Sequence, residues 1–233
     1  FNTNHKIFFP DKFMFVSNWQ IQQYKNIDIP KILVEYPIEY QDRLSRVKTL
    51  TKLGLDPSKK HILHVGLFTP RKNQAEFFEY ARSLPEYQFH CLGNQAGNFE
   101  YYWKPLMEDK PDNIVWWNER TDVERFYGCM DLFLFTSRGS DNDKETMPLV
   151  IREAISHQIP QLLYNLPVYL NYFDKFDSIG YLNYDDFDSN VKLIRSTLNG
   201  NDIKPEEEAY VVCTYPVSDA ITQTTKECIE SLK

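Results

Sequence analysis

Short apolar segments alternate with helical segments along most of this chain, and this order constrains the fold more than any other feature. Six segments have the composition of buried strands: residues 61–65, 87–92, 113–117, 132–135, 161–164 and 179–182. Helical patterns cover residues 43–53, 73–84, 99–107, 121–129, 149–157, 168–174 and 186–198. Strands that alternate with helices form a parallel sheet covered on both faces, with right-handed crossovers. We therefore predict an α/β fold with a Rossmann-like, doubly wound parallel sheet.

The composition indicates a globular protein and excludes several classes. Of the 233 residues, 42% are hydrophobic and 15% aromatic, and the net charge of -7 argues against a general nucleic-acid binder. No apolar run reaches the roughly 20 residues of a membrane span, and the first residues lack the layout of a signal peptide. The cysteines, Cys91, Cys129, Cys213 and Cys228, form no CxxC pattern. We expect a cytoplasmic protein with reduced core cysteines and no transmembrane span.

The stretch from residue 132 to residue 160 has the order strand, polar loop, helix. Pro148 stands where a helix can begin, with Glu145 just before it and Glu153 within it. Apolar residues of this helix, Leu149, Val150, Ala154 and Ile155, are expected to face the sheet. Helix N-termini at the carboxyl ends of parallel strands attract anions, because their first N–H groups have no partner in the helix. The pattern predicts a phosphate site bracketed by two carboxylates.

A second stretch, residues 61–78, places two cations where they would oppose a helix dipole. Gly66 ends the strand, and Arg71 and Lys72 come at the start of the following helix. Cations at a helix N-terminus are slightly unfavourable, and a bound anion would remove the conflict. This stretch therefore also predicts a phosphate site.

Together these stretches resemble the signature of retaining glycosyltransferases of the GT-B fold, in the large nucleotide-sugar-dependent family 4, also called glycosyl transferases group 1. The resemblance rests on Glu145, seven intervening residues and Glu153, then Ala154, and later Pro160 before an apolar strand. It implies that Glu145 lies beside the donor sugar and Glu153 holds the ribose. Lys72 matches the lysine that grips the donor diphosphate, whereas Leu67 stands where the family has an arginine. We expect Arg71 to supply that charge.

The resemblance also implies further contacts with the donor. Pro148 has no N–H, so the neighbouring amides from residue 146 to residue 149 must make more of the phosphate contacts. Lys72 and Glu145 are the predicted catalytic residues. The predicted donor-binding set is Gly66, Arg71, Lys72, Gly93, Asn118, Arg120, Glu145, Thr146, Met147, Pro148, Leu149 and Glu153.

The same resemblance suggests a division of the chain. Residues 1–40 contain a strand pattern at 12–16, a helical piece at 19–24 that Ser17 can cap, and a strand pattern at 32–36. This order resembles the crossing between the two domains of GT-B enzymes. Residues 41–200 would then be the donor-binding domain and residues 201–233 would include a closing helix at 219–232. We expect most of the N-terminal domain, with its share of the acceptor site, to be missing from this chain.

The predicted activity is metal-independent, retaining transfer of a sugar from a UDP-, GDP- or ADP-sugar to an unknown glycan, lipid or protein acceptor, with no cofactor. One alternative is a nucleotide-sugar binding module without turnover. Another is a metal-dependent GT-A-type transferase, in which Asp141 and Asp143 would form an Asp-x-Asp metal site. The sequence has no GxGxxG, P-loop or GxSxG motif for other nucleotide or hydrolase classes. We predict that His61, His64, His90 and His157 are core or rim residues.

Overall fold

The computed structural model describes residues 10–34, 38, 40–42, 44–138, 145 and 147–200. These residues divide into two compact units, and the boundary between the units falls after residue 39. In the smaller unit, β1 (Phe13–Phe15) and β2 (Lys31–Leu33) pair in parallel, and α1 (Asn18–Gln23) connects them. Ser17 Oγ accepts a hydrogen bond from the Gln20 N–H at 3.1 Å, which caps α1 as predicted. Residues 35 and 36 of the predicted second strand lie outside the described residues.

The larger unit is built around a parallel sheet. Within its described residues the sheet has six strands in the order β5-β4-β3-β6-β7-β8. The strands are β3 (His61–Val65), β4 (Gln88–Leu92), β5 (Ile114–Trp117), β6 (Leu132–Phe135), β7 (Gln161–Tyr164) and β8 (Ile179–Leu182). The helices are α2 (Arg46–Lys52), α3 (Gln74–Ser83), α4 (Glu100–Glu108) after a short 3-10 turn (Gly97–Phe99), α5 (Val123–Tyr127), α6 (Leu149–Ser156), α7 (Pro167–Phe173) and α8 (Phe187–Leu198). This order confirms the predicted doubly wound α/β fold.

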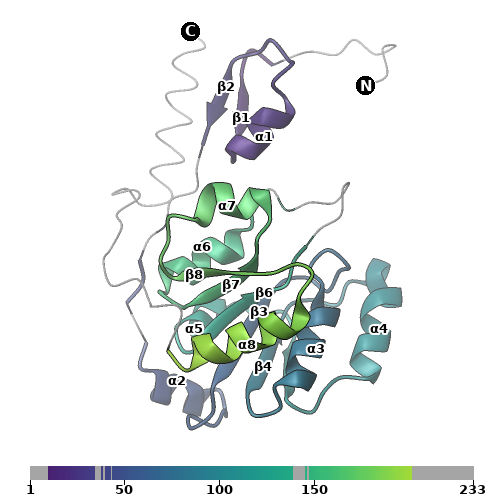
Figure 1. The fold of residues 1–233 in the computed structure, drawn as a ribbon, viewed down its shortest axis with the longest axis vertical. Coiled ribbons are helices and arrows are strands. Elements are labelled where there is room, and N and C mark those ends of the chain that lie inside the picture. Colours follow the sequence, from purple (N-terminus) through teal and green to yellow (C-terminus); the bar gives the residue numbers. More distant parts are fainter. Residues whose placement is uncertain are drawn as a thin grey trace. The chain divides into compact units, whose positions relative to one another are not determined.

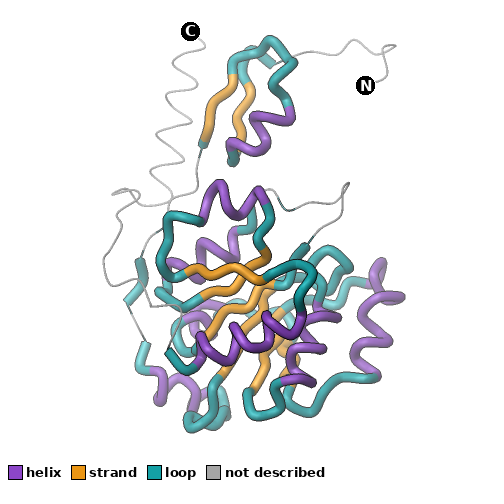
Figure 2. The backbone as a smooth tube through the Cα atoms, in the orientation of Figure 1, coloured by secondary structure: helices purple, strands orange, loops and turns teal. Residues whose placement is uncertain are grey.

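Helices cover both faces of the sheet, as Figures 1 and 2 show. On one face, α3, α4 and α8 pack on a buried cluster that includes Ile62, Phe77 and Ile194. On the other face, Tyr127 of α5 contacts Phe133 with ring centroids 5.6 Å apart. Strands buried on both faces are mostly apolar along their length, which explains the largely apolar strand segments in the sequence.

Several predicted helix boundaries differ from the structure. The first predicted helix begins at Arg46 and not at residue 43, and it ends at Lys52, one residue before the predicted end. Gly54 follows the cap residue Leu53 with a φ of 73°, which suits glycine. The helix predicted over residues 121–129 is shorter in the structure, where α5 runs from Val123 to Tyr127. Just before this helix, Arg120 pairs with Asp122 at 2.8 Å.

The buried face of α6 also differs from the prediction. Leu149 is 47% exposed and Val150 is half-buried, whereas Ile151 and Arg152 are buried with Ala154 and Ile155. Residues three and four positions apart share one helix face, so burial of residues 154 and 155 brings residue 151 to the sheet and turns residue 149 away.

Three of the four histidines predicted to lie in the core or at its rim, His61, His64 and His90, are buried. The Trp117 Nε1–H donates to His90 Nδ1 at 3.1 Å, so His90 carries its hydrogen on Nε2 and donates it to His61 Nδ1 at 2.9 Å. His61 in turn donates from Nε2 to the Asp56 carbonyl at 2.8 Å. Burial, and then the neighbouring His61, lowers the pKa of His90 to about 3. The chain of bonds therefore requires neutral rings.

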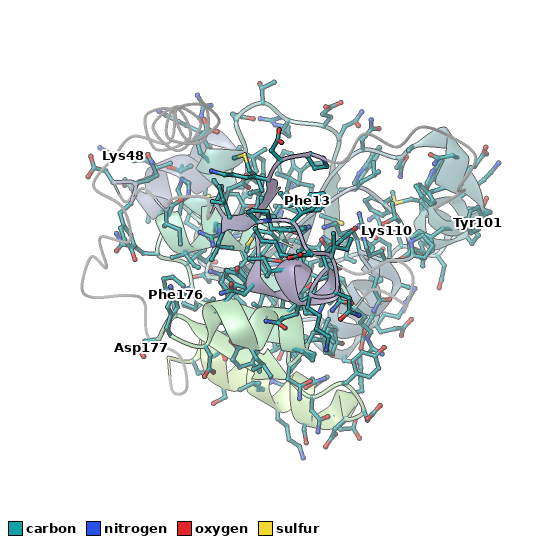
Figure 3. The ribbon with its side chains drawn as sticks, turned by 90° about the horizontal axis from the view of Figure 1, so that it is seen from above. Phe13, Lys48, Tyr101, Lys110, Phe176 and Asp177 are labelled. Atoms are coloured by element: carbon teal, nitrogen blue, oxygen red, sulfur yellow. The ribbon has the colours of Figure 1, made fainter. Side chains whose placement is uncertain are left out.

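The surface of the larger unit is polar and carries isolated aromatic side chains. Tyr101 on α4 is 71% exposed and points outward at the margin of the unit, and the exposed Lys48 on α2 lies at another margin (Figure 3). Cys91 and Cys129 are free and buried, as predicted, and Cys213 and Cys228 lie outside the described residues. In the part of the chain that the structure describes, no helix is both long and apolar enough to cross a membrane.

Candidate functional site

The sheet reverses its direction of winding between β3 and β6, which are neighbours. The chain runs outward from β3 through β4 to β5, then returns to β6 and runs the other way through β7 to β8. At such a switch point the loops that follow the two central strands diverge and leave a crevice at the carboxyl edge of the sheet. One of these loops, residues 66–73, carries Arg71 and Lys72, and the other carries Glu145.

The loop after β3 is held in place by side chains from the strands around it. Thr136 Oγ1 lies 2.9 Å from the Asn73 carbonyl and 3.2 Å from the Lys72 carbonyl, and Ser137 Oγ lies 3.0 Å from the Arg71 carbonyl. His64 donates from Nε2 to the Lys72 carbonyl at 3.2 Å. Burial, and then the charge of Lys72, lowers the pKa of His64 to about 3, so its ring is neutral. These bonds fix the backbone that carries the two cations.

Four side chains, Glu145, Lys72, Arg71 and Ser137, converge and are called here the Glu145 centre. Lys72 Nζ lies 2.5 Å from Glu145 Oε1, Ser137 Oγ lies 3.0 Å from the same oxygen, and Arg71 Nε lies 3.6 Å from it. The side chains of Glu145 and Lys72 are only 9% and 13% exposed. Lys72 Nζ also lies 4.8 Å from the centre of the Phe135 ring. Among the residues that the structure describes, the centre thus brings two cations together with one carboxylate.

The glycines that follow β3 and β4 permit a close approach of the two loops. A Cβ at Gly93, whose φ is 153°, would lie 2.0 Å from the Gly66 carbonyl oxygen. A Cβ at Gly66 would lie 3.2 Å from the side chain of Lys72. Both glycines therefore have a structural reason to be small, and their contact with a sugar donor stays a prediction.

The start of α6 lies at the same edge of the sheet as Lys72. Glu145 contacts Lys72, and the four chain steps from Glu145 to Leu149 span at most about 14 Å. Glu153 follows roughly 6 Å along the helix. It is exposed, and its Oε2 accepts a hydrogen bond from the Tyr127 hydroxyl at 2.9 Å. Lys72 and the helix that carries Glu153 can thus face one ligand.

The other predicted donor-binding residues lie further from this centre or already have partners. Asn118 and Arg120 follow β5, the outermost strand on that side, and Arg120 pairs with Asp122 and lies 5.6 Å from the centre of the Trp117 ring. Met147 and Pro148 are buried just before α6. Thr146 lies outside the described residues. For all of them the predicted role stays a prediction.

Several residues that shape the site were not among the predicted site residues. Ser137 and Thr136 were assigned only to a strand and a loop, although small hydroxyl residues at the carboxyl end of a central strand are a usable signal. Arg138 was also missed. It pairs with Glu76 of α3 and lies 4.6 Å and 4.3 Å from the ring centres of Tyr164 and Tyr184. Its partners come from three separate segments, so only the fold brings them together.

A metal site and a cavity elsewhere in the larger unit are the two alternatives to the Glu145 centre. Among the residues that the structure describes, no group of three His, Cys, Asp or Glu side chains could hold a metal ion, and Asp141 and Asp143 lie outside those residues. A cavity of about 470 Å³ lies at the opposite, amino-terminal edge of the sheet, where Lys60, Asp131 and Pro160 precede the strands. That cavity does not include any residue of the Glu145 centre.

Known proteins resemble this chain in sequence and in fold. A processive diacylglycerol alpha-glucosyltransferase from Acholeplasma laidlawii is 24% identical over 179 residues, which are 74% of this chain and 51% of the relative. The chain thus spans about half the length of this relative. A glycosyltransferase from Rickettsia africae matches with a TM-score of 0.76 and 16% identity over 96% of this chain and 64% of that one. HepE from Anabaena, crystallised with UDP-glucose, matches with a TM-score of 0.75 and 14% identity over 95% and 64%.

The solved structures show that the fold is that of known glycosyltransferases. The family model for glycosyl transferases group 1 matches residues 46–209, which include the whole described sheet and the Glu145 centre. Because this match covers more than half of the sequence, the chain belongs to the glycosyl transferases group 1 family.

Proposed function

We propose that this chain is the donor-binding part of a retaining, metal-independent glycosyltransferase that takes its sugar from a nucleotide diphosphate sugar. The observation that carries the proposal is the convergence of Lys72, Arg71 and Glu145 at the switch point of the sheet. A diphosphate would lie between the two cations and the N-terminus of α6. The sugar would lie beside Glu145 and the ribose beside Glu153.

The chemistry of such a site is stabilisation of the leaving group. When the bond between the sugar and the donor phosphate breaks, negative charge builds on the phosphate oxygen. Lys72 and Arg71, together with the first amides of α6, are fixed groups that can stabilise this charge in a site with little water. The side chains around the loop of residues 66–73 hold these groups in place before the substrate arrives, which lowers the cost of reorganisation. Protein cations can do this work without a metal ion.

The comparisons favour a hexosyl donor. The Acholeplasma relative is named as an alpha-glucosyltransferase, and HepE was crystallised with UDP-glucose. UDP-glucose is therefore the first donor to test, and GDP- and ADP-sugars are the alternatives. The acceptor would be a glycan, a lipid or a protein. Part of its binding site would come from a region that corresponds to the half of the Acholeplasma relative that this chain does not span.

Calorimetric titration with UDP, GDP and ADP tests the proposal directly. We expect one nucleotide to bind the 233-residue chain, and Lys72→Met to weaken that binding by about 2 to 3 kcal/mol, because the phosphate loses a charged hydrogen bond. Lys104→Met is the matched control, since Lys104 forms an exposed ion pair with Glu100 on α4. Equal affinities for the wild type and Lys72→Met would refute the role of Lys72.

A turnover assay separates the two alternatives. Release of sugar from UDP-glucose with EDTA present would support metal-independent catalysis, whereas activity that EDTA abolishes would favour a metal site at Asp141 and Asp143. Tight nucleotide binding without turnover would favour a binding module. The stereochemistry of a transferred sugar, read by NMR, would test retention.

A further inference from the structure

In the Glu145 centre both cations lie close to one carboxylate oxygen. Glu145 Oε1 lies 2.5 Å from Lys72 Nζ and 3.6 Å from Arg71 Nε. In the proposed function these two cations bind the donor diphosphate. A phosphate bound at these cations would therefore lie close to the Glu145 carboxylate.

We propose that Glu145 makes the site discriminate against the bare nucleoside diphosphate and in favour of the nucleotide-sugar. This inference rests on the proposed function and adds a specificity role for one carboxylate. Specificity is a difference between two affinities, and a group that penalises the wrong ligand can create it.

The two ligands differ in charge and in what they offer to Glu145. The terminal phosphate of a bare diphosphate carries more negative charge than the same phosphate linked to a sugar, and it has no hydroxyl to donate. At Lys72, whose ammonium has three N–H donors, it would lie beside Glu145, and the two anions would then share a largely buried site. A buried carboxylate that loses its charged partner is costly.

A nucleotide-sugar avoids most of that cost. Its phosphate can bind Lys72 while its sugar hydroxyls donate hydrogen bonds to Glu145. The carboxylate thus gains hydroxyl donors where it shares the lysine with the phosphate. Ser137 Oγ, 3.0 Å from Glu145 Oε1, can keep its bond to this carboxylate when the nucleotide-sugar binds. Tyr169, whose hydroxyl donates to the Ser137 carbonyl at 3.4 Å, supports this serine from α7.

The consequence for turnover is faster release of the product. After transfer, the sugar leaves with the acceptor and the bare diphosphate remains against Lys72. Glu145 then has no hydroxyl partner and competes for the lysine again. The carboxylate that orients the sugar in the substrate would thus help to expel the spent nucleotide.

Titration of UDP and UDP-glucose into Glu145→Gln and Glu145→Ala tests the inference. We expect both variants to bind UDP about ten-fold more tightly than the wild type, because one charged hydrogen bond of Lys72 becomes available to the phosphate. UDP-glucose should bind no more tightly than in the wild type, so the ratio of the two affinities shifts towards UDP. Thermal melting identifies a variant that fails to fold, and the second substitution then carries the same expectation.

Glu86→Gln is the matched control. Glu86 also pairs with an arginine, Arg195 at 2.8 Å, but it precedes β4 at the other edge of the sheet. This variant should leave both affinities unchanged. If the wild type binds UDP and the Glu145 variants bind it no more tightly, the discrimination role is wrong although the proposed function stands. If the wild type binds no nucleotide or nucleotide-sugar, the proposed function fails and this inference fails with it.

Discussion

The two edges of the sheet each hold a mostly buried carboxylate between two cations, yet they differ in what those groups bind. At the carboxyl edge Glu145 is 9% exposed within the Glu145 centre. At the amino edge Asp131 is 10% exposed and pairs with Arg46 at 2.7 Å and with Lys60 at 3.3 Å. By charge alone the two clusters are equivalent.

The difference lies in the bonds to the backbone. Asp131 accepts the His61 backbone N–H at 2.8 Å, and Arg46 donates to the carbonyls of Pro57 at 2.9 Å and Lys59 at 2.8 Å. These bonds tie α2 to the first residues of β3 and β6. Within the described part of the chain, Glu145 is held by the side chains of the Glu145 centre. Side-chain partners can be exchanged for a ligand without unfolding, whereas backbone partners cannot.

The comparison also shows why cavity size is a poor guide in this protein. The cavity of about 470 Å³ lies beside Asp131, where Arg46 already binds two backbone carbonyls. The carboxyl edge has the loops and helix N-termini that recognise anions in sheets of this type. The position of a charge cluster relative to the strand ends therefore tells more about its function than the volume next to it.

The largest expected effect is on stability, at the amino edge. Asp131→Ala should lower the free energy of unfolding by about 3 to 5 kcal/mol, because it leaves Arg46 and the His61 amide without their acceptor. Nucleotide affinity, measured where the variant is still folded, should stay within about two-fold. Asp109→Ala is the control, since the Asp109 side chain is 88% exposed, and an exposed ion pair contributes less than about 1 kcal/mol. If the Asp131 variant folds but no longer binds nucleotide, the amino edge also takes part in binding, and its assignment as purely structural is wrong.

The second prediction concerns the carboxyl edge, where a substitution should weaken nucleotide binding and leave stability almost unchanged. Glu153→Ala should weaken nucleotide binding by about 1 to 3 kcal/mol, the cost of a lost charged hydrogen bond to the ribose. Stability should change little, because Glu153 is exposed. Tyr127→Phe removes the hydroxyl that binds Glu153 at 2.9 Å and keeps the carboxylate, so it should not weaken nucleotide binding. Unchanged affinity in Glu153→Ala would contradict the ribose assignment.

Much of the fold could be predicted because parallel strands are buried on both faces. Four strands, β3, β6, β7 and β8, have the predicted bounds, since each is a continuous apolar run between polar turns. Helix starts were harder to predict. The start of α5 at Val123 has no strong signal in the apolar pattern, and the face of α6 that meets the sheet depends on the packing of Ile151 in the folded chain.

The candidate site was only partly visible in the sequence. Lys72, Arg71 and Glu145 stood out because they flank helix starts, where cations and carboxylates can meet a phosphate. Ser137 could not be recognised in the same way. Its hydroxyl lies within hydrogen-bond distance of both Glu145 and the Arg71 carbonyl, and only the folded chain shows this. Such a role depends on two loops that are far apart in sequence and adjacent only at the switch point.

The third prediction concerns the pH dependence of stability, which the buried histidine His90 should affect. The pKa of His90 is lowered to about 3 in the folded chain from an ordinary value of 6.5, so below pH 6.5 the unfolded chain binds a proton that the folded chain excludes. Stability is therefore full above pH 6.5 and falls as the pH drops towards 3. Between pH 7 and pH 5 this residue alone should cost about 2 kcal/mol. Urea unfolding at pH 7, 6 and 5 measures it, and His90→Gln should flatten the slope; an unchanged slope would exclude His90 as its source.

The smallest effect concerns Arg71, and it tests how the carboxyl edge replaces the arginine expected at Leu67. The Arg71 side chain is 35% exposed and lies further from Glu145 than Lys72 does, so solvent and salt screen its charge more. Arg71→Met should weaken nucleotide binding by about 1 kcal/mol at low salt and by less at high salt, whereas the effect of Lys72→Met should persist. Because Leu67 is 40% exposed on the same loop, adding Leu67→Arg to the Arg71→Met variant should restore the affinity. If the folded double variant does not regain affinity, an arginine at position 67 cannot reach the phosphate that Arg71 contacts. The idea that Arg71 replaces the arginine expected at position 67 would then be wrong.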